Sequence, residues 1–424
     1  MSLLASALLL GGLALSPYRY FLLPVAGVAM MAFVRLREPA LGLLVLLPYV
    51  PLLNLEGLLR YSPGTSELYP SEVILLTAFA IVGWRRPRSV GFDGAGRLAV
   101  GFALWMAIAA LAGAPATDTA RLARLLRTAF LAAAAFALGR AAGRRPGGAL
   151  SWIDGAGGAV GLFALLALVE AAFHLGQGVP RTGSALGGSE LLAIHLTLLA
   201  PPGLGLVALA ADRSRATRLI LALAGLALFA SFSRSGWIGG WAAILGMGLM
   251  AGKIDPRRGR WLAGAAWILL AAAVAAAVGL AAAGGALGDY GARLRSLADP
   301  PGLLHDRGRE WTQGLASIGA HPLFGDPEAA NPYNLILGLA AVSGLPILIP
   351  FGALVIAAFR GGSSALETAA TRAPALGLLG ASIGLLVTGM GESSLGARVT
   401  PAAMATLGLL TGLGTAATTP RPKR

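Results

Sequence analysis

The sequence predicts an all-α polytopic membrane protein with 12–14 transmembrane helices, and three observations carry this prediction. Of its 424 residues, 56% are hydrophobic and only 12% are charged, against about 25% charged residues in a typical soluble domain. The mean hydropathy is +0.74. The 60 glycines suit helices that pack closely in lipid, where small side chains let two backbones approach each other.

The apolar residues form fourteen candidate spans. They lie near residues 2–15, 20–34, 40–54, 70–84, 98–114, 128–142, 155–176, 190–211, 217–232, 235–251, 261–284, 333–358, 373–391 and 399–416. Several early spans are shorter than the roughly 20 residues that cross a bilayer as a helix, so a re-entrant or tilted segment among the first three stays open. The predicted organisation is transmembrane helices 1–11 in residues 1–284 and a large loop with an amphipathic helix in 285–332. Three C-terminal transmembrane helices follow in 333–416, with a tail in 417–424.

Basic residues predict the orientation of these spans, because lysine and arginine accumulate in cytoplasmic loops. With the N-terminus inside, most of the 33 basic residues fall on the inner side, and every inner loop carries at least two of them. We therefore expect both termini in the cytoplasm. The formal net charge of +14 then reflects orientation and contact with membrane lipids, and we expect no nucleic-acid partner.

The remaining arginines lie on the outer side, where orientation does not explain them. Arg181 lies in PRTGSALGGSE, and Arg234 lies in SFSRSGWIGGW between two spans. The longest outer segment carries a further set of basic and titratable residues: Arg293, Arg295, His305, Arg307, Arg309 and His321. An arginine within hydrocarbon costs about 2.5–3.5 kcal/mol, so such residues need a partner. Converging arginines bind phosphate or diphosphate well, although each one alone can also extend to lipid head groups.

Soluble-enzyme motifs are missing from the sequence. It has no Walker loop, no G-x-S-x-G, no H-E-x-x-H and no cysteine, and no pattern predicts a metal site or a cofactor. Glu170, His174 and His195 lie in or near spans. Two interpretations stay open: proton or ion sites, or structural positions that make helix–helix hydrogen bonds or lie at the membrane interface.

The most distinctive stretch is the outer loop and the span after it, residues 307–349. Trp311, Leu315 and Ile318 follow helical spacing, the pattern breaks at His321–Pro322, and a new apolar run begins at Tyr333. A long loop with its own helical periodicity is usually functional. We therefore expect a site at the membrane surface here.

Four segments together resemble the O-antigen ligase and O-antigen polymerase superfamily of bacterial lipid-linked glycan transferases. In chain order they are RTGSALGGSELLA, SFSRSGW, RGREWTQGLASIGAHPLFG and YNLILGLAAVSGLP. They are similar to the family's R-x-G segment, its Ser-Arg motif, its loop helix ending in Pro-Leu-x-Gly, and its histidine-asparagine motif closed by a glycine. The resemblance covers residues from about Arg181 to Pro346.

This resemblance implies a GT-C-like fold in the bacterial inner (cytoplasmic) membrane with a periplasmic active site. It implies an inverting, metal-independent transfer from an undecaprenyl diphosphate-linked glycan donor to a sugar hydroxyl. The acceptor is another lipid-linked glycan in a polymerase, which we favour slightly, or lipid A core in a ligase. By matching positions, Arg234 and Arg307 bind the diphosphate with Arg181 and Arg309 in support, and Asn334, Gly344 and Trp311 support the site.

One departure concerns the proton acceptor, because the family's histidine falls on Tyr333. A phenol with an ordinary pKa near 10 is a poor base at neutral pH. Either Tyr333 only orients the acceptor, or His321 or His305 replaces it, or the acceptor needs little activation. The alternative class is a multi-span lipid or polysaccharide transporter or flippase, against which we find no repeated half of the chain.

Overall fold

A computed structural model describes residues 47–49, 94–113, 119–145, 147–174, 188–209, 215–231, 233–282, 300–326, 329, 334–390 and 400–418. In this part of the chain every regular element is a helix. Most of the first four predicted spans lies outside the described residues. The prediction of 12–14 spans therefore stays a prediction, whereas the all-α class is confirmed for the described part.

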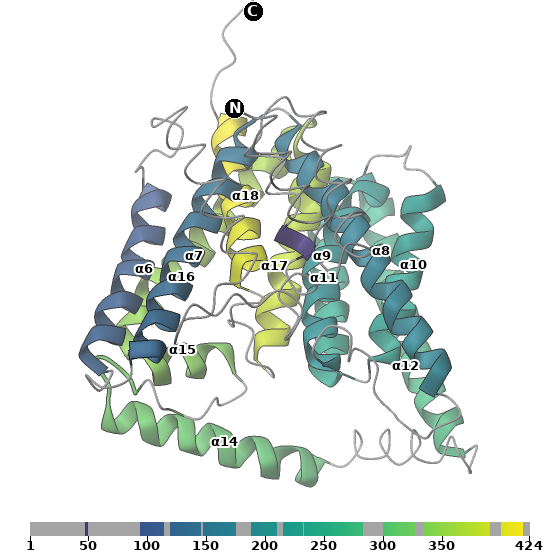
Figure 1. The fold of residues 1–424 in the computed structure, drawn as a ribbon. Coiled ribbons are helices and arrows are strands. Elements are labelled where there is room, and N and C mark those ends of the chain that lie inside the picture. Colours follow the sequence, from purple (N-terminus) through teal and green to yellow (C-terminus); the bar gives the residue numbers. More distant parts are fainter. Residues whose placement is uncertain are drawn as a thin grey trace, which may run out of the picture.

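The helices follow the predicted apolar runs from residue 94 onward (Figure 1). They are α6 (Gly94–Gly113), α7 (Thr119–Gly143), α8 (Gly148–His174), α9 (Ser189–Leu209), α10 (Arg215–Ala230), α11 (Arg234–Gly252), α12 (Pro256–Ala282), α14 (Pro300–Ala320), α15 (Leu335–Ser343), α16 (Leu348–Glu367), α17 (Arg372–Gly389) and α18 (Thr400–Thr418). Two short 3-10 helices are η1 (Leu47–Tyr49) and η5 (Leu345–Ile347). Segments that must satisfy their backbone polar groups inside lipid adopt helices because the helix makes those hydrogen bonds internally.

Six helices of the described part are long and apolar enough to cross a membrane. These segments are Gly94–Gly113, Leu125–Gly143, Gly148–Ala172, Ser189–Leu209, Leu345–Glu367 and Arg372–Gly389, with Ala402–Thr418 as a shorter apolar helix. The chain is thus consistent with a multi-pass membrane protein, as its composition predicts.

Small residues hold the long helices together. Gly139 and Gly143 of α7 face the backbone of α18 near Ala405 and Gly412, so closely that an added Cβ would overlap backbone atoms. On α18, Gly408 meets α7 in the same way, and the order of these contacts makes the two helices parallel. Close backbone approach of this kind is how helices associate in lipid, where burial of apolar surface offers little driving force.

The ends of the bundle differ in charge. The α7–α8 turn, the α11–α12 turn, the α16–α17 turn and the C-terminus of α18 lie together at one end, here called the basic end (Figure 1). The basic residues there include Arg144, Arg145, Lys253, Arg257, Arg258 and Arg372. Among the described residues, the predicted inner turns between α7 and α8, α11 and α12, and α16 and α17 therefore share one end of the fold. The compartment that this end faces stays a prediction.

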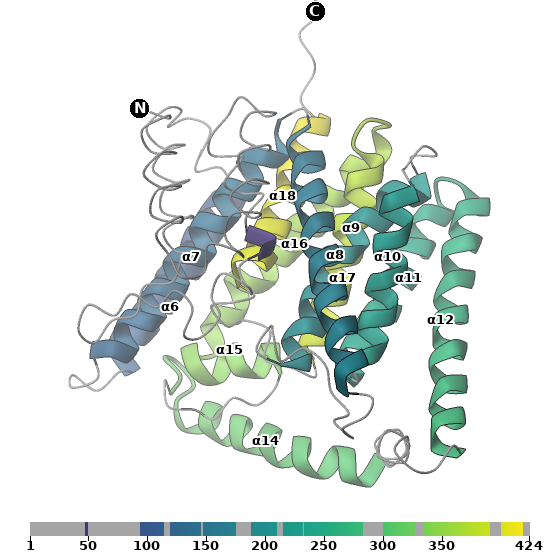
Figure 2. The same ribbon diagram turned by 45° about the vertical axis from the view of Figure 1, so that its right-hand side comes forward.

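Helix α14 lies across the opposite end, here called the α14 end (Figures 1 and 2). The neighbouring segment departs in detail from the predicted continuous span over 333–358. The short helix α15 ends at Ser343, the chain turns at Gly344 through η5, and α16 starts at Leu348. Gly344 has φ 76° and ψ 165°, a conformation reserved for glycine, and Pro346 cannot donate the hydrogen bond that would continue α15.

Candidate functional site

The α14 end collects the starts of α9, α11 and α15 together with α14 itself (Figure 2). Three of the four motif segments found in the sequence lie at these positions, and the first leads into α9. Arg234 opens α11, Asn334 precedes α15, and Arg307 belongs to α14. Arg181 and Tyr333 lie outside the described residues, and for Arg307 and His305 only the helical backbone is described.

The α10–α11 corner fixes the position of Arg234. Ser233 caps α11, and its Oγ accepts a hydrogen bond from the backbone N–H of Gly236 at 3.2 Å. Trp237 closes the corner, because its Nε1 donates to the carbonyl of Leu228 at 2.8 Å and its ring stacks on Phe229 at 5.1 Å. The serine cap explains why the chain turns so tightly here.

Arg234 itself is half-buried at the first position of α11. A cation at a helix N-terminus opposes the helix dipole by about 0.3–1 kcal/mol. An anion at the same place interacts favourably with both the guanidinium and the dipole. The corner therefore has the electrostatic character of an anion-binding position.

A second corner joins the end of α14 to the end of α15. The backbone N–H of Asp326 donates to the carbonyl of Ala341 at 2.7 Å, and that of Leu345 donates to the carbonyl of Pro322 at 2.8 Å. Gly325 (φ 69°) and Gly344 (φ 76°) face this contact, and an added Cβ on either would overlap the backbone opposite. Gly344 therefore holds the Pro322–Gly325 segment in place through chain geometry, and its part in a functional site stays a prediction.

Trp105 of α6 completes this corner. Its Nε1 donates to the carbonyl of Ser343 at 2.9 Å, and its ring stacks on Phe324 with centroids 5.9 Å apart. Sequence reasoning missed Trp105, since a lone tryptophan in an apolar span is ordinary at a membrane interface. Its only sequence signal is its place on the same side of α6 as Phe102, one turn earlier.

Asn334 is a structural clamp. Its Oδ1 accepts hydrogen bonds from the backbone N–H groups of Ile336 and Leu337, both at 3.0 Å. Its Nδ2 donates to the carbonyl of Met390 at 3.0 Å. One side chain therefore caps α15 and ties it to the end of α17, which explains the asparagine of the fourth motif without a direct role in chemistry.

The covered side of α14 differs from the predicted one, which contained Trp311, Leu315 and Ile318. Trp311 is half-buried and Gly314 and Ile318 are buried, whereas Leu315 is 58% exposed. Ile318 packs against Ala340 and Ala341 of α15. By helical spacing, Arg307 stands one turn before Trp311 on this same side of the helix axis.

Two other predicted residues are separated from that side. Arg309 is exposed on the opposite side of α14. His321 is exposed just beyond the last turn of α14, and thirteen residues of helix place that end about 20 Å from Arg307. The structure therefore does not bring His321 or Arg309 together with the arginine at position 307.

The intramembrane titratable residues have distinct settings. His195 is fully buried in α9, its Nδ1 donates to the carbonyl of Leu191 at 2.7 Å, and Phe163 of α8 meets its ring edge-on at 6.1 Å. This bond lies within α9, so it is not the predicted helix–helix hydrogen bond, and a role for His195 as a proton or ion site stays a prediction. Because α8 and α9 run antiparallel with Phe163 beside His195, Glu170 lies about level with the first turn of α9, half-buried at the α14 end.

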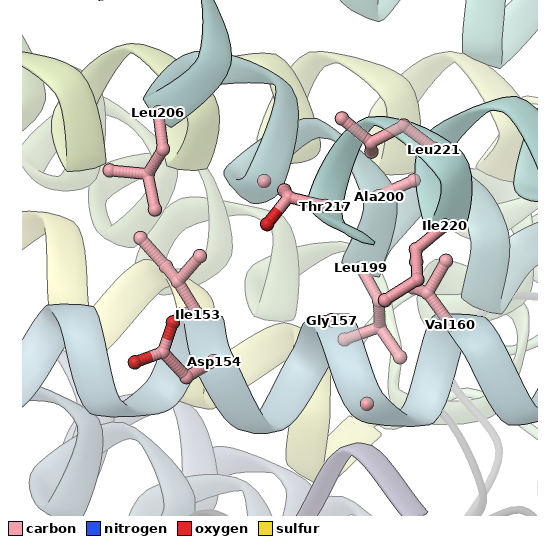
Figure 3. Close-up of a pocket in the computed structure, with 12 residues that line it drawn as sticks. Ile153, Asp154, Gly157, Val160, Leu199, Ala200, Leu206, Thr217, Ile220 and Leu221 are labelled. Carbon is pink, nitrogen blue, oxygen red and sulfur yellow. The ribbon is translucent and has the colours of Figure 1, made fainter. Parts of the chain in front are cut away.

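A cavity of about 100 Å³ lies elsewhere, between α8, α9 and α10 (Figure 3). Its walls are largely apolar and include Val160, Leu199 and Leu221, with Asp154 and Thr217 as the polar contributors. These positions belong to the first halves of α8 and α10 and the second half of α9, toward the basic end. The cavity is therefore remote from Arg234 and α14.

No protein-family model matches the chain. No curated protein matches its sequence either.

Proposed function

We propose that the protein is a membrane glycosyltransferase that moves an undecaprenyl diphosphate-linked glycan to a sugar hydroxyl at the α14 end. The observation that carries this proposal is the position of Arg234 at the start of α11, at the end of the bundle crossed by the helix that contains Arg307 (Figure 2). Two arginines on separate elements at one end of a bundle suit a diphosphate, because each guanidinium can bind phosphate oxygens through two parallel hydrogen bonds.

In the proposed reaction the acceptor hydroxyl oxygen attacks the anomeric carbon from the side opposite the diphosphate. The bond from that carbon to the diphosphate oxygen breaks, and the electron pair leaves with the diphosphate. The arginines stabilise the negative charge that develops on the leaving group, as fixed cations do in a site shielded from water. The configuration at the anomeric carbon inverts, and the hydroxyl proton passes to a base.

Tyr333 remains our candidate for the group that contacts the acceptor hydroxyl, with Asn334 as its neighbour in the chain. His321 suits the role less well, because the helix separates it by about 20 Å from Arg307. Glu170 is a further carboxylate at the same end of the bundle. A half-buried carboxylate facing a bundle is a reasonable proton acceptor.

The test replaces each arginine and follows transfer in cells that lack the chromosomal gene. Arg234→Ala and Arg307→Ala should lower transfer by about 10²–10³-fold each, the loss typical for one fixed charge-stabilising donor. Lysine at either position should restore little, because an ammonium cannot form the paired hydrogen bonds of a guanidinium. The matched control is Arg309→Ala, which removes the same charge two residues away on the exposed side of α14.

The readout is the polysaccharide pattern on a gel, with protein abundance in the membrane measured alongside. Full activity of Arg307→Ala, or equal losses for Arg307→Ala and Arg309→Ala, would contradict the proposal. The same gel distinguishes the two acceptors. Deletion leaves single repeats attached to core if the protein is a polymerase, and polymer on the lipid carrier with bare core if it is a ligase.

A further inference from the structure

Two hydrogen-bond donors on α14 have no acceptor. Trp311 Nε1 and Ser317 Oγ are buried, and among the residues that the structure describes neither atom has a hydrogen-bond partner. Buried polar groups are satisfied in the great majority of cases, so each exception calls for an explanation. Neighbouring groups behave normally: Thr312 Oγ1 donates to the carbonyl of Gly308 at 2.7 Å, and Trp105 Nε1 has its acceptor at Ser343.

Both donors lie on the covered side of α14. Trp311 and Ser317 flank Gly314, which is buried, and Ile318 next to Ser317 packs against α15. Thr312 on the opposite side of α14 is exposed, and so are Gln313 and Leu315 at the two borders of the covered side. The two donors are therefore on the side of α14 that turns toward α15 and the bundle.

The apolar attachment of α14 in the described residues is at its C-terminal part. There Ile318 meets Ala340 and Ala341, with Leu337 and Leu348 close by. Trp311 lies seven residues earlier, about 10 Å along the axis, and is not part of that apolar cluster. The covered side thus combines an apolar contact at Ile318, with the unpaired Ser317 hydroxyl beside it, and an unpaired indole N–H at Trp311.

We propose that this side of α14 binds the first two sugars next to the diphosphate of the glycan donor. Trp311 Nε1 would donate to an oxygen of one sugar, and Ser317 Oγ, about 9 Å farther along the helix axis, to an oxygen of the next. The inference rests on the proposed function and deepens it by assigning a specificity subsite. Both donors are uncharged, which suits hydroxyl and ring oxygens better than phosphate, and an indole also offers a flat apolar surface to a pyranose ring. Position 307 lies one turn, about 6 Å, before Trp311, so a sugar at Trp311 would follow directly on a diphosphate at Arg307.

The test measures binding of two lipid probes to the purified full-length protein in nanodiscs. The probes are undecaprenyl diphosphate and the same lipid carrying a disaccharide that begins with N-acetylhexosamine, and the readouts are the dissociation constant and the melting temperature. The variants are Trp311→Phe, which keeps the ring and removes the N–H, and Ser317→Ala. Gln313→Ala on the exposed side of α14 is the control for the helix, and Trp105→Phe is the control for a tryptophan whose N–H is paired.

The melting temperature without ligand separates a binding role from a structural one. Trp311→Phe and Ser317→Ala remove donors that have no partner in the free protein, so their melting temperatures should stay at the wild-type value or rise. Trp105→Phe should melt at a lower temperature because it loses the hydrogen bond to Ser343. If Trp311→Phe and Ser317→Ala melt as low as Trp105→Phe, the donors are paired within the protein and the proposal is wrong.

The two probes then identify what the donors bind. The wild-type protein should bind the sugar-carrying lipid more tightly than the bare diphosphate lipid, and each variant should weaken binding of the sugar-carrying lipid by about tenfold, as expected for one hydrogen bond. Binding of the bare lipid should not change. Equal weakening for both lipids would assign the donors to the diphosphate, and no weakening for either would leave them without a ligand role; both results overturn the proposal. If the wild-type protein binds both lipids equally well, the proposed subsite is wrong but the proposed function stands. If it binds neither lipid, the proposed function is wrong as well.

Discussion

Substitution of Gly344 by alanine should release α14 from the bundle. Gly344 adopts φ 76° and ψ 165°, a region that costs a non-glycine residue about 1–3 kcal/mol. The new Cβ would also overlap the backbone of Leu323 and Phe324, and such overpacking typically costs a further ~1–3 kcal/mol. The two effects act on the same corner, so we expect the free energy of local opening there to fall by about 3 kcal/mol or more.

Hydrogen exchange measures this opening directly. A fall of about 3 kcal/mol speeds exchange of amides protected by the corner by roughly a hundredfold, since each 1.4 kcal/mol is a factor of ten. The affected amides should include those of Asp326 and Leu345, whose hydrogen bonds cross the corner. Those of α9 should be unchanged, because α9 packs elsewhere in the bundle.

The matched control is Gly319→Ala in the last turns of α14. An added Cβ at Gly319 meets no atom within 4 Å, and alanine favours the helix by up to about 1 kcal/mol over glycine. This variant should keep or strengthen protection of α14. If Gly344→Ala exchanges at the wild-type rate across the corner, the glycine does not hold the two segments together and the structural account of the fourth motif fails.

Three further predictions concern the same end of the fold. Asn334→Ala should lower the melting temperature, because it removes a cap worth about 1 kcal/mol and the bond to Met390, whereas Asn334→Asp, which keeps the capping oxygen, should lie between Ala and wild type. Single cysteines introduced into this cysteine-free chain should be labelled from the periplasm near Ala298 and from the cytoplasm near Arg257. Labelling of position 298 only from the cytoplasm would put Arg234 and Arg307 on the cytoplasmic side and contradict a periplasmic site. Tyr333→Phe should lower transfer by roughly 10²-fold or more if the hydroxyl takes the acceptor proton. Tyr333→His should raise the transfer rate below about pH 7. Equal rates for Tyr, Phe and His at this position would show that another group accepts the proton.

The sequence alone was enough to predict the class of the fold. Apolar runs such as 190–211 and 373–391 became α9 and α17 within two residues at each end. The reason is that lipid contact acts on each segment separately: a run of this length must be helical to satisfy its backbone, whatever it packs against. The gathering of Arg144, Lys253 and Arg372 at one end also follows from counting loops, because consecutive spans alternate in direction.

The site depended on contacts that hydropathy does not encode. The run beginning at Tyr333 stays apolar through Gly344, so nothing in its hydropathy separates α15 from α16; the contact between Gly344 and the Pro322–Gly325 segment explains the break. Periodicity placed Leu315 with Trp311 and Ile318, yet Gly314 is buried beside the contact of Ile318 with α15, and Leu315 is exposed. The roughly 20 Å that separate His321 from Arg307 follow from the rise of one helix. The side of that helix that is covered is set by packing in three dimensions, because a sequence pattern describes one helix without its neighbours.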